Sequence, residues 1–170
     1  MVKRTSHAEA SCPVARPLDA IGDGWSLLII RDAFDGLTRF SEFQRSLGLA
    51  KNILTTRLRN LVEHGILEQV PASDGSAYSE YVLTPKGAAL FPVLVALRQW
   101  GEDHCFTPSE DHVELVDMTT GAPVPRLELR APDGRVLGPA DTEVRPPPVT
   151  RRTPRGGSRG SPPPRAARRR

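Results

Sequence analysis

Long apolar runs and paired cysteines are both lacking in this chain. Apolar runs such as Leu27 to Ile30 are far shorter than the roughly 20 residues that a membrane-spanning helix needs. The two cysteines, Cys12 and Cys105, are too few for a disulfide framework. The N-terminal stretch up to Pro13 has no apolar segment of the kind found in signal peptides. We therefore expect a cytoplasmic protein with reduced thiols and no membrane partner.

Sequence signatures of catalysis and metal binding are missing as well. Neither a phosphate-cradling glycine loop nor an HExxH pair occurs in the chain. His104, Cys105 and His112 lack the paired spacing of a metal site, and exposed residues at a helix end explain them better. We therefore expect no enzyme, no cofactor and no metal.

Positive charge is scarce outside the C-terminal end. The chain has 23 Lys and Arg against 20 Asp and Glu, and arginine greatly outnumbers lysine. Residues 145–170 contain nine of the arginines and no acid, which leaves residues 1–144 with a net charge of −6. The sequence pI of about 9.2 is therefore a property of the tail. A mildly acidic body argues against broad, charge-driven coating of nucleic acid.

Two helical patterns meet across a glycine-containing turn in residues 39–65. Ser41, with Gln44 three residues later, has the capping-box spacing and predicts the start of a short first helix. A second helix is expected over residues 51–64, with Gly65 as the glycine that follows its end. Two helices joined in this way predict a helix-turn-helix.

The expected second helix has two contrasting faces. Leu54, Leu58 and Leu61 form an apolar stripe at helical spacing. The opposite face and its flanks carry amide, hydroxyl and charged side chains: Asn52, Thr55, Thr56, Arg57, Arg59, Asn60 and Glu63. Such side chains reach base edges and phosphates in a major groove, and residues 39–64 carry a local net charge of +3. The alternative is that this polar face is merely solvated.

Eight side chains of the helix pair are expected to contact DNA. Base edges are expected to meet Asn52, Thr55, Thr56 and Arg59. Phosphates are expected to meet Arg39, Ser41, Lys51 and Arg57. Contacts of the first kind select an operator, whereas contacts of the second kind position the protein on any duplex.

Further elements are predicted on both sides of this pair. Pro13 at a helix N1 position and Trp25 at the start of an apolar segment predict two helices upstream. Downstream, β-prone runs over residues 66–70 and 78–83 flank Asp74-Gly75, which is a strong hairpin signal. A hairpin directly after a recognition helix is the wing of a winged helix. Its tip contains no Arg or Lys, so strong phosphate clamping by the tip is not expected.

A long helix is expected from Thr84-Pro85 to His104. Its apolar face is wider than one small core needs, and helix-turn-helix readers commonly bind two half-sites as symmetric pairs. We therefore expect a homodimer whose interface consists of Val14, Leu18, Leu94, Leu97 and Trp100. The alternative is that this helix only covers its own core.

Motif positions spread over residues 12–104 occur in a recognisable order. They are Cys12-Pro13, Gly22, Trp25, Arg31, Phe40-Ser41-Glu42-Phe43, Leu54-Thr55, Arg57-Leu58, Gly65, Tyr81, Leu83-Thr84, Gly87 and Trp100. Together they closely resemble the HxlR family of bacterial winged-helix transcription regulators, which are relatives of the MarR group. The resemblance implies a homodimer that binds double-stranded operator DNA and acts as a repressor or activator. Asp23-Gly24 departs from the family, which usually has a basic residue before the tryptophan, so a phosphate contact or turn stabilisation there is not implied.

Cys12 is the candidate sensor that this resemblance implies, because several HxlR-like regulators sense electrophiles or oxidants through a cysteine at this position. A thiol at a helix N-terminus feels the helix dipole and unpaired amides, which favour the thiolate. The alternative is a small residue that packs or caps.

Four segments are expected along the chain: a disordered N-terminus (1–11), an HxlR-type winged helix-turn-helix domain (12–105), a small β-rich extension (106–145) and a disordered Arg/Pro-rich tail (146–170). Turn signals at Thr120-Gly121 and Asp133-Gly134 predict three strands in the extension. It resembles the zinc-ribbon extension of some HxlR-like proteins without the cysteines, and we expect it to pack on the winged helix or a partner subunit. The fold class is therefore mainly α with a β-hairpin wing, a β appendage and a disordered tail.

We expect a sequence-specific transcriptional regulator that acts as a homodimer in the cytoplasm of a bacterium. Two alternatives stay open. One is a winged-helix module for protein contacts that has no DNA affinity of its own. The other is a reader gated by redox stress or by a small-molecule effector, which would bind between the wing and the dimer helices.

Overall fold

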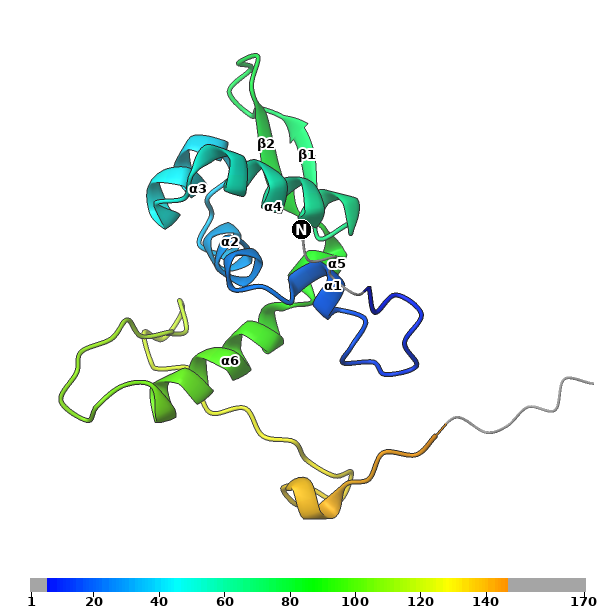
Figure 1. Ribbon diagram of the computed structural model, residues 1–170. Helices are drawn as coiled ribbons and strands as arrows, with labels where there is room; N and C mark the ends of the chain where they lie inside the picture. Colours follow the sequence, from blue (N-terminus) through cyan, green and yellow to red (C-terminus); the bar gives the residue numbers. More distant parts are fainter. Residues whose placement is uncertain (1–5, 147–170) are drawn as a thin grey trace, which may run out of the picture. The chain divides into compact units, whose positions relative to one another are not determined.

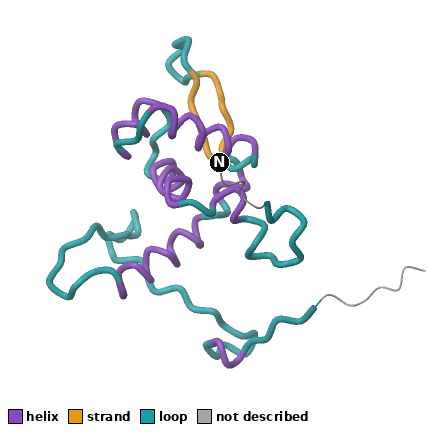
Figure 2. Tube along the Cα trace, viewed as in Figure 1, coloured by secondary structure: helices purple, strands orange, loops and turns teal. Residues whose placement is uncertain are grey.

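The computed structural model describes residues 6–146, which form a mainly helical architecture with a two-stranded antiparallel sheet (Figures 1 and 2). The elements are α1 (Leu18–Ile21), α2 (Gly24–Phe34), α3 (Phe40–Leu47), α4 (Lys51–Glu63), β1 (Leu67–Pro71), β2 (Ser79–Leu83), α5 (Pro85–Ala88), α6 (Phe91–His104) and the 3-10 helix η1 (Pro139–Asp141). The chain divides into two units, residues 1–127 and 128–170. None of the helices in the described part of the chain has the length and apolar character that spanning a bilayer needs.

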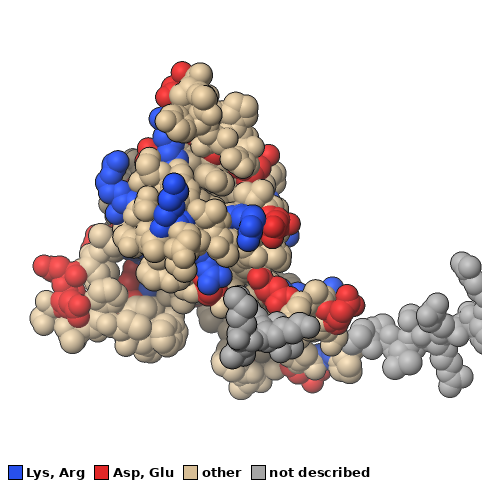
Figure 3. All heavy atoms as spheres, turned by 45° about the horizontal axis from the view of Figure 1, so that its top comes forward, with Lys and Arg blue, Asp and Glu red and all other residues tan. Residues whose placement is uncertain are grey.

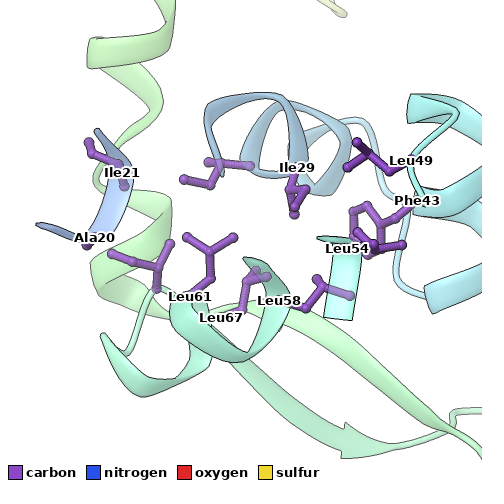
Figure 4. Close-up of a cluster of buried hydrophobic side chains, with 11 residues drawn as sticks. Ala20, Ile21, Ile29, Phe43, Leu49, Leu54, Leu58, Leu61 and Leu67 are labelled. Atoms are coloured by element: carbon purple, nitrogen blue, oxygen red, sulfur yellow. The ribbon is translucent and has the colours of Figure 1, made fainter. Parts of the chain in front are cut away.

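The hydrophobic core lies where α2, α3, α4 and β1 converge (Figure 4). Ile29 of α2, Phe43 of α3 and Leu54 of α4 are fully buried, and Leu58 and Leu61 continue the same stripe of α4. Burying one such side chain contributes about 1.5–3 kcal/mol. The apolar stripe predicted for the second helix is therefore its core-facing side, and the opposite side is turned outward.

The hairpin has the predicted position. Strands β1 and β2 are antiparallel, with Leu67 opposite Leu83 and Pro71 opposite Ser79. Gly75 has a φ of +74°, the left-handed conformation that glycine adopts without steric cost, and it lies at the tip. A winged helix-turn-helix is thus confirmed as the fold.

The first helix is shorter than predicted. The sequence pattern placed its start at Pro13, whereas α1 begins at Leu18. Pro17 explains the difference, because it has no N–H to donate to the carbonyl of residue 13 and disfavours helical backbone at Arg16. The residues before Pro17 therefore form turns.

The start of α3 also differs from the prediction. Its N-cap is Arg39, and Ser41 lies inside the first turn. The Glu42 carboxylate accepts hydrogen bonds from the backbone N–H groups of Thr38 at 3.0 Å and Arg39 at 2.9 Å, so Glu42 has the reciprocal role expected of Gln44.

The long helix predicted from Thr84 to His104 is broken into α5 and α6. Pro92 is the cause, because in a continuous helix its ring would clash with the carbonyl of Ala88 and the backbone hydrogen bond to that carbonyl would be lost. The break places Pro92 in the first turn of α6, where no intrahelical N–H is needed.

Residues 113–127 run along α6 within the first unit. The Gln99 amide nitrogen donates to the Pro125 carbonyl at 3.0 Å, and its oxygen accepts from the Leu127 N–H at 2.9 Å. The Arg126 guanidinium pairs with Asp103 at 2.6 Å and with Glu102 at 3.3 Å. The beginning of the extension therefore contacts the long helix through hydrogen bonds and ion pairs.

The β structure of the extension is reduced to isolated bridges. Val116 pairs with Pro123 in the first unit and Arg130 with Val136 in the second, around the two predicted turns. Full strands do not form in its described residues, since each bridge has no neighbouring pair to extend it.

The N-terminal segment is held to α1 from residue 6 onward. The Ser6 hydroxyl and the His7 N–H both donate to the Asp19 carboxylate, at 2.7 and 2.8 Å. Residues 6–11, for which disorder was expected, thus include two residues with contacts to α1. Residues 1–5, and the tail from residue 147, lie outside the described residues.

Candidate nucleic-acid interface

The turn between α3 and α4 sets the angle of the helix pair. Gly48 closes α3 in the left-handed conformation with a φ of +62°, and its N–H donates to the Gln44 carbonyl. Leu49 is buried directly after it. The chain can therefore reverse within three residues and start α4 at Lys51 with one face on the core.

Most of the predicted reading face of α4 is exposed. Lys51, Asn52, Thr55, Thr56 and Arg59 are all exposed. The hydroxyls of Thr55 and Thr56 donate to the carbonyls four residues earlier, at 2.8 and 2.9 Å. These threonines therefore present methyl groups and acceptor lone pairs outward, a combination suited to a thymine methyl group or to a base-edge donor.

Asn60 is the exception on this face. Its side-chain amide donates to the Ala20 carbonyl at 3.1 Å and is partly buried. The helical pattern placed it on the polar side because periodicity alone does not show that α1 packs there. Asn60 therefore connects α4 to α1 rather than pointing to solvent.

Arg57 is engaged in an ion pair. Its Nε lies 3.3 Å from the Asp23 carboxylate, although the contact lacks hydrogen-bond geometry, and its side chain is 30% exposed. The same carboxylate caps α2 by accepting from the N–H and hydroxyl of Ser26, at 3.0 and 2.7 Å. Asp23, which is part of the Asp23-Gly24 departure from the family pattern, thus caps α2 and pairs with Arg57, a candidate phosphate contact.

Arg39 is paired with two acids of the hairpin. Its Nη2 donates to the Asp74 carboxylate at 2.6 Å and lies 3.5 Å from the Glu80 carboxylate. This hydrogen bond raises the pKa of Arg39 and holds the pKa of Asp74 well below its usual range. Both partners stay charged at neutral pH, so Arg39 reaches a phosphate only in competition with the wing.

Ser41 and Lys51 are the less encumbered phosphate candidates. Both side chains are exposed, on α3 and at the start of α4 respectively. Arg59, a candidate for base contact, lies 3.8 Å from Glu63 in an exposed pair, which is a weak restraint. Figure 3 shows Lys and Arg side chains dispersed over this side of the molecule, with acidic groups at the wing end.

Ile53 is a surface residue that the sequence reasoning missed. Its side chain is 39% exposed on α4, next to Asn52. The signal was present, because Ile53 lies outside the stripe of Leu54, Leu58 and Leu61. An exposed apolar side chain on a reading face suits the methyl group of thymine.

Apolar side chains are also exposed on α6 and near α1. Of the five residues expected at a dimer interface, Val14, Leu18, Leu97 and Trp100 are between 43% and 70% exposed. Leu94 instead packs partly against the core. Val93, at 49%, extends the exposed apolar face of α6. Exposed apolar side chains are the residues from which contacts between proteins are commonly built.

Cys12 is exposed, but it does not lie at a helix N-terminus. Because α1 starts at Leu18, the helix-dipole argument for an activated thiol no longer applies. Cys105, just after α6, is also free and exposed.

A cavity of about 620 Å³ lies between α2 and α6 and is also lined by residues 113–115. Its wall is mostly apolar, with Leu27, Phe34 and Phe91 among the lining residues. Charged side chains of both signs line the same cavity: Arg31, Arg98, Asp32, Asp35 and Glu114. The volume is within the range of small-molecule sites.

Comparison with known proteins adds independent findings. Residues 20–109 match the model of the HxlR-like helix-turn-helix family. The uncharacterized HTH-type transcriptional regulator Rv3095 of Mycobacterium tuberculosis (strain ATCC 25618 / H37Rv) is 39% identical over 120 residues, which cover 71% of this chain and 76% of the relative.

Two solved structures are similar to this chain. The crystal structure of PA1607, a candidate transcription factor, has a TM-score of 0.80 and 68% identity, and covers 83% of this chain and 99% of its own. The redox regulator HypR in its oxidized form has a TM-score of 0.51 and 33% identity, and covers 56% of this chain and 100% of its own. The PA1607 match extends well beyond residues 20–109, so its similarity reaches into the flanking segments.

Proposed function

Because this chain belongs to the HxlR-like helix-turn-helix family of transcriptional regulators, we propose that it binds operator DNA sequence-specifically as a homodimer. Its relatives are named as transcriptional regulators rather than enzymes. The proposed setting is the cytoplasm of a bacterium.

The observation that carries the proposal is the orientation of α4. Leu54, Leu58 and Leu61 are fully buried, which turns Asn52 and Thr56 to solvent on a rigid helix. The backbone of an anchored helix loses little further freedom on binding, so the hydrogen bonds of its side chains can discriminate between bases.

The proposed roles follow from exposure and pairing. Base edges meet Asn52, Thr55, Thr56 and Arg59, with Ile53 added by the structure. Phosphates meet Ser41 and Lys51 directly, whereas they meet Arg39 and Arg57 in competition with the acids that already pair with these guanidinium groups.

Mobility shifts on the protein's own upstream intergenic DNA and on a scrambled duplex test this proposal. Lys51→Ala should weaken binding to both sequences alike and lower the salt slope by about 1. Arg59→Ala should weaken binding to the preferred sequence by about 1–3 kcal/mol and reduce discrimination. Gln69→Ala, at an exposed position of β1, is the control. Salt-independent or absent binding by the wild-type chain contradicts the proposal.

A winged-helix module for protein contacts is the second candidate. The specific observation in its favour is the wing tip, which carries Asp74 and no basic residue over positions 71–77. A wing of this charge does not bind phosphate by itself. Absent DNA binding together with an intact fold would favour this candidate.

Two forms of control over DNA binding are proposed as additions. HypR is described as a redox regulator and has been solved in oxidized and reduced forms. In this chain Cys12 is exposed, so oxidants can reach it. Unchanged operator binding after alkylation of Cys12 would remove it as a sensor.

For a small-molecule effector, the cavity between α2 and α6 is the candidate site. An occupant would contact both α2, which packs on the DNA-binding helices, and the long helix α6.

A further inference from the structure

An ion-pair cluster joins the wing to the start of α3. Arg39 lies between Asp74 at the wing tip and Glu80 on β2, and Glu80 also accepts the Ser73 hydroxyl at 3.1 Å. The base of the wing has separate backbone support, because the Tyr81 N–H donates to the Thr38 carbonyl at 2.8 Å. The wing therefore stays attached to this edge of α3 without Asp74.

The two acids of this cluster differ in their surroundings. Glu80 is 7% exposed and lies within the ladder of β2, which makes it part of the wing's structure. The Asp74 side chain is 49% exposed and accepts one further hydrogen bond, from the Ser76 N–H at 3.0 Å. Asp74 also makes the shorter contact with Arg39, at 2.6 Å against 3.5 Å. Asp74 is therefore the acid that competes most directly for this guanidinium at the surface.

We propose that Asp74 is a negative determinant of DNA affinity, which holds the Arg39 guanidinium on the wing tip and competes with backbone phosphate for it. This inference rests on the proposed function. A phosphate that takes Arg39 leaves a carboxylate uncompensated beside the DNA backbone, and like charges repel. The effect does not depend on base sequence, so it weakens binding to all duplexes alike. Asp74 thereby limits non-specific occupancy and leaves discrimination to α4.

Asp74→Asn tests this directly in the full-length chain. The asparagine oxygen still accepts from the Ser76 N–H, so the turn is preserved while the charge is removed. We expect binding to a mixed-sequence duplex, measured by fluorescence anisotropy, to tighten by about 3- to 10-fold, with a salt slope steeper by about 1. Glu68→Gln is the matched control, because it removes an exposed acid from β1 of the same hairpin without a contact to Arg39.

Arg39→Gln separates competition for the guanidinium from a general charge effect. In the Arg39→Gln background, Asp74→Asn should tighten binding no more than Glu68→Gln does. A full gain in that background overturns the inference, as does an Asp74→Asn chain that binds no tighter than the control while the wild type binds normally. If every variant, the wild type included, fails to bind, the proposed function fails and this inference fails with it.

Discussion

At some positions in this fold the identity of a single residue determines the packing, because a larger side chain would clash with neighbouring backbone. Gly87 is buried in α5, and a Cβ built there would lie 2.1 Å from the Ile66 carbonyl oxygen. That carbonyl also accepts from the Thr84 N–H at 3.1 Å. The absence of a side chain at Gly87 therefore lets α5 pack directly on the backbone that leads into the wing.

Gly87→Ala should lower the free energy of unfolding by about 1–3 kcal/mol, because backbone must shift to remove the clash. Gly101→Ala is the matched control. It lies in α6 with no atom within 4 Å of the added Cβ, and should stabilise by about 0.5–1 kcal/mol through helix propensity. Urea denaturation of both variants measures the difference. Equal stability of the two would contradict the packing argument.

At the scale of elements, the start of α3 combines a helix cap with the attachment of the wing. The Glu42 carboxylate takes two backbone N–H groups just before the helix, and Thr38 contributes its carbonyl to β2. These two hydrogen bonds lower the pKa of Glu42, and the bond from the Arg39 N–H has the larger effect. The charged form of Glu42 therefore stabilises α3 and the loop that supports the hairpin.

Glu42→Gln should lower stability at neutral pH by about 1 kcal/mol. The pKa of Glu42 is lower in the folded than in the unfolded chain, so its contribution is complete above the ordinary glutamate pKa. It is lost as pH falls through the lower folded value. The stability gap between wild type and variant should consequently narrow on acidification. Thermal melts from neutral to acidic pH measure this stability difference, with Glu68→Gln as the control. A difference that widens at low pH would contradict the stabilising role of the charged Glu42.

At the scale of the whole molecule, α6 divides its surface among three tasks. Val95 is buried and lines a hollow together with Leu115 and Val124, Gln99 and Glu102 hold residues 113–127, and Leu97 and Trp100 stay exposed. The segment after α6 lies beside Val95 as well as the polar positions, and it leaves Leu97 and Trp100 exposed. That division favours the use of the exposed face for a second subunit.

Leu97→Glu should shift the chain from dimer to monomer, since it places a charge in an apolar interface while the monomer leaves the position 48% exposed. Sedimentation velocity measures the shift. Gln69→Glu, at an exposed position of β1, adds the same charge elsewhere and should leave the dimer intact. A wild-type chain that sediments as a monomer would contradict the homodimer outright.

Much of the winged helix could be predicted from local pattern. The stripe of Leu54, Leu58 and Leu61 and the Asp74-Gly75 turn are signals contained within a few residues, and the structure places them as expected. Helix ends were less predictable where proline acts, as at Pro17 and Pro92. The cost of proline depends on a carbonyl four residues earlier, which apolar spacing does not register.

The partners of the candidate site came only from the tertiary structure. Asp23 and Arg57 are 34 positions apart, and Arg39 and Asp74 are 35 positions apart. Amphipathic spacing by itself determined which face of α4 is polar, because burial of leucines requires that orientation. Which polar side chains on that side are available to DNA was decided by long-range packing, which brought Asn60 to the Ala20 carbonyl and two arginines to carboxylates. Charge pairing across the fold has no periodicity along the chain, so no sequence pattern could reveal it.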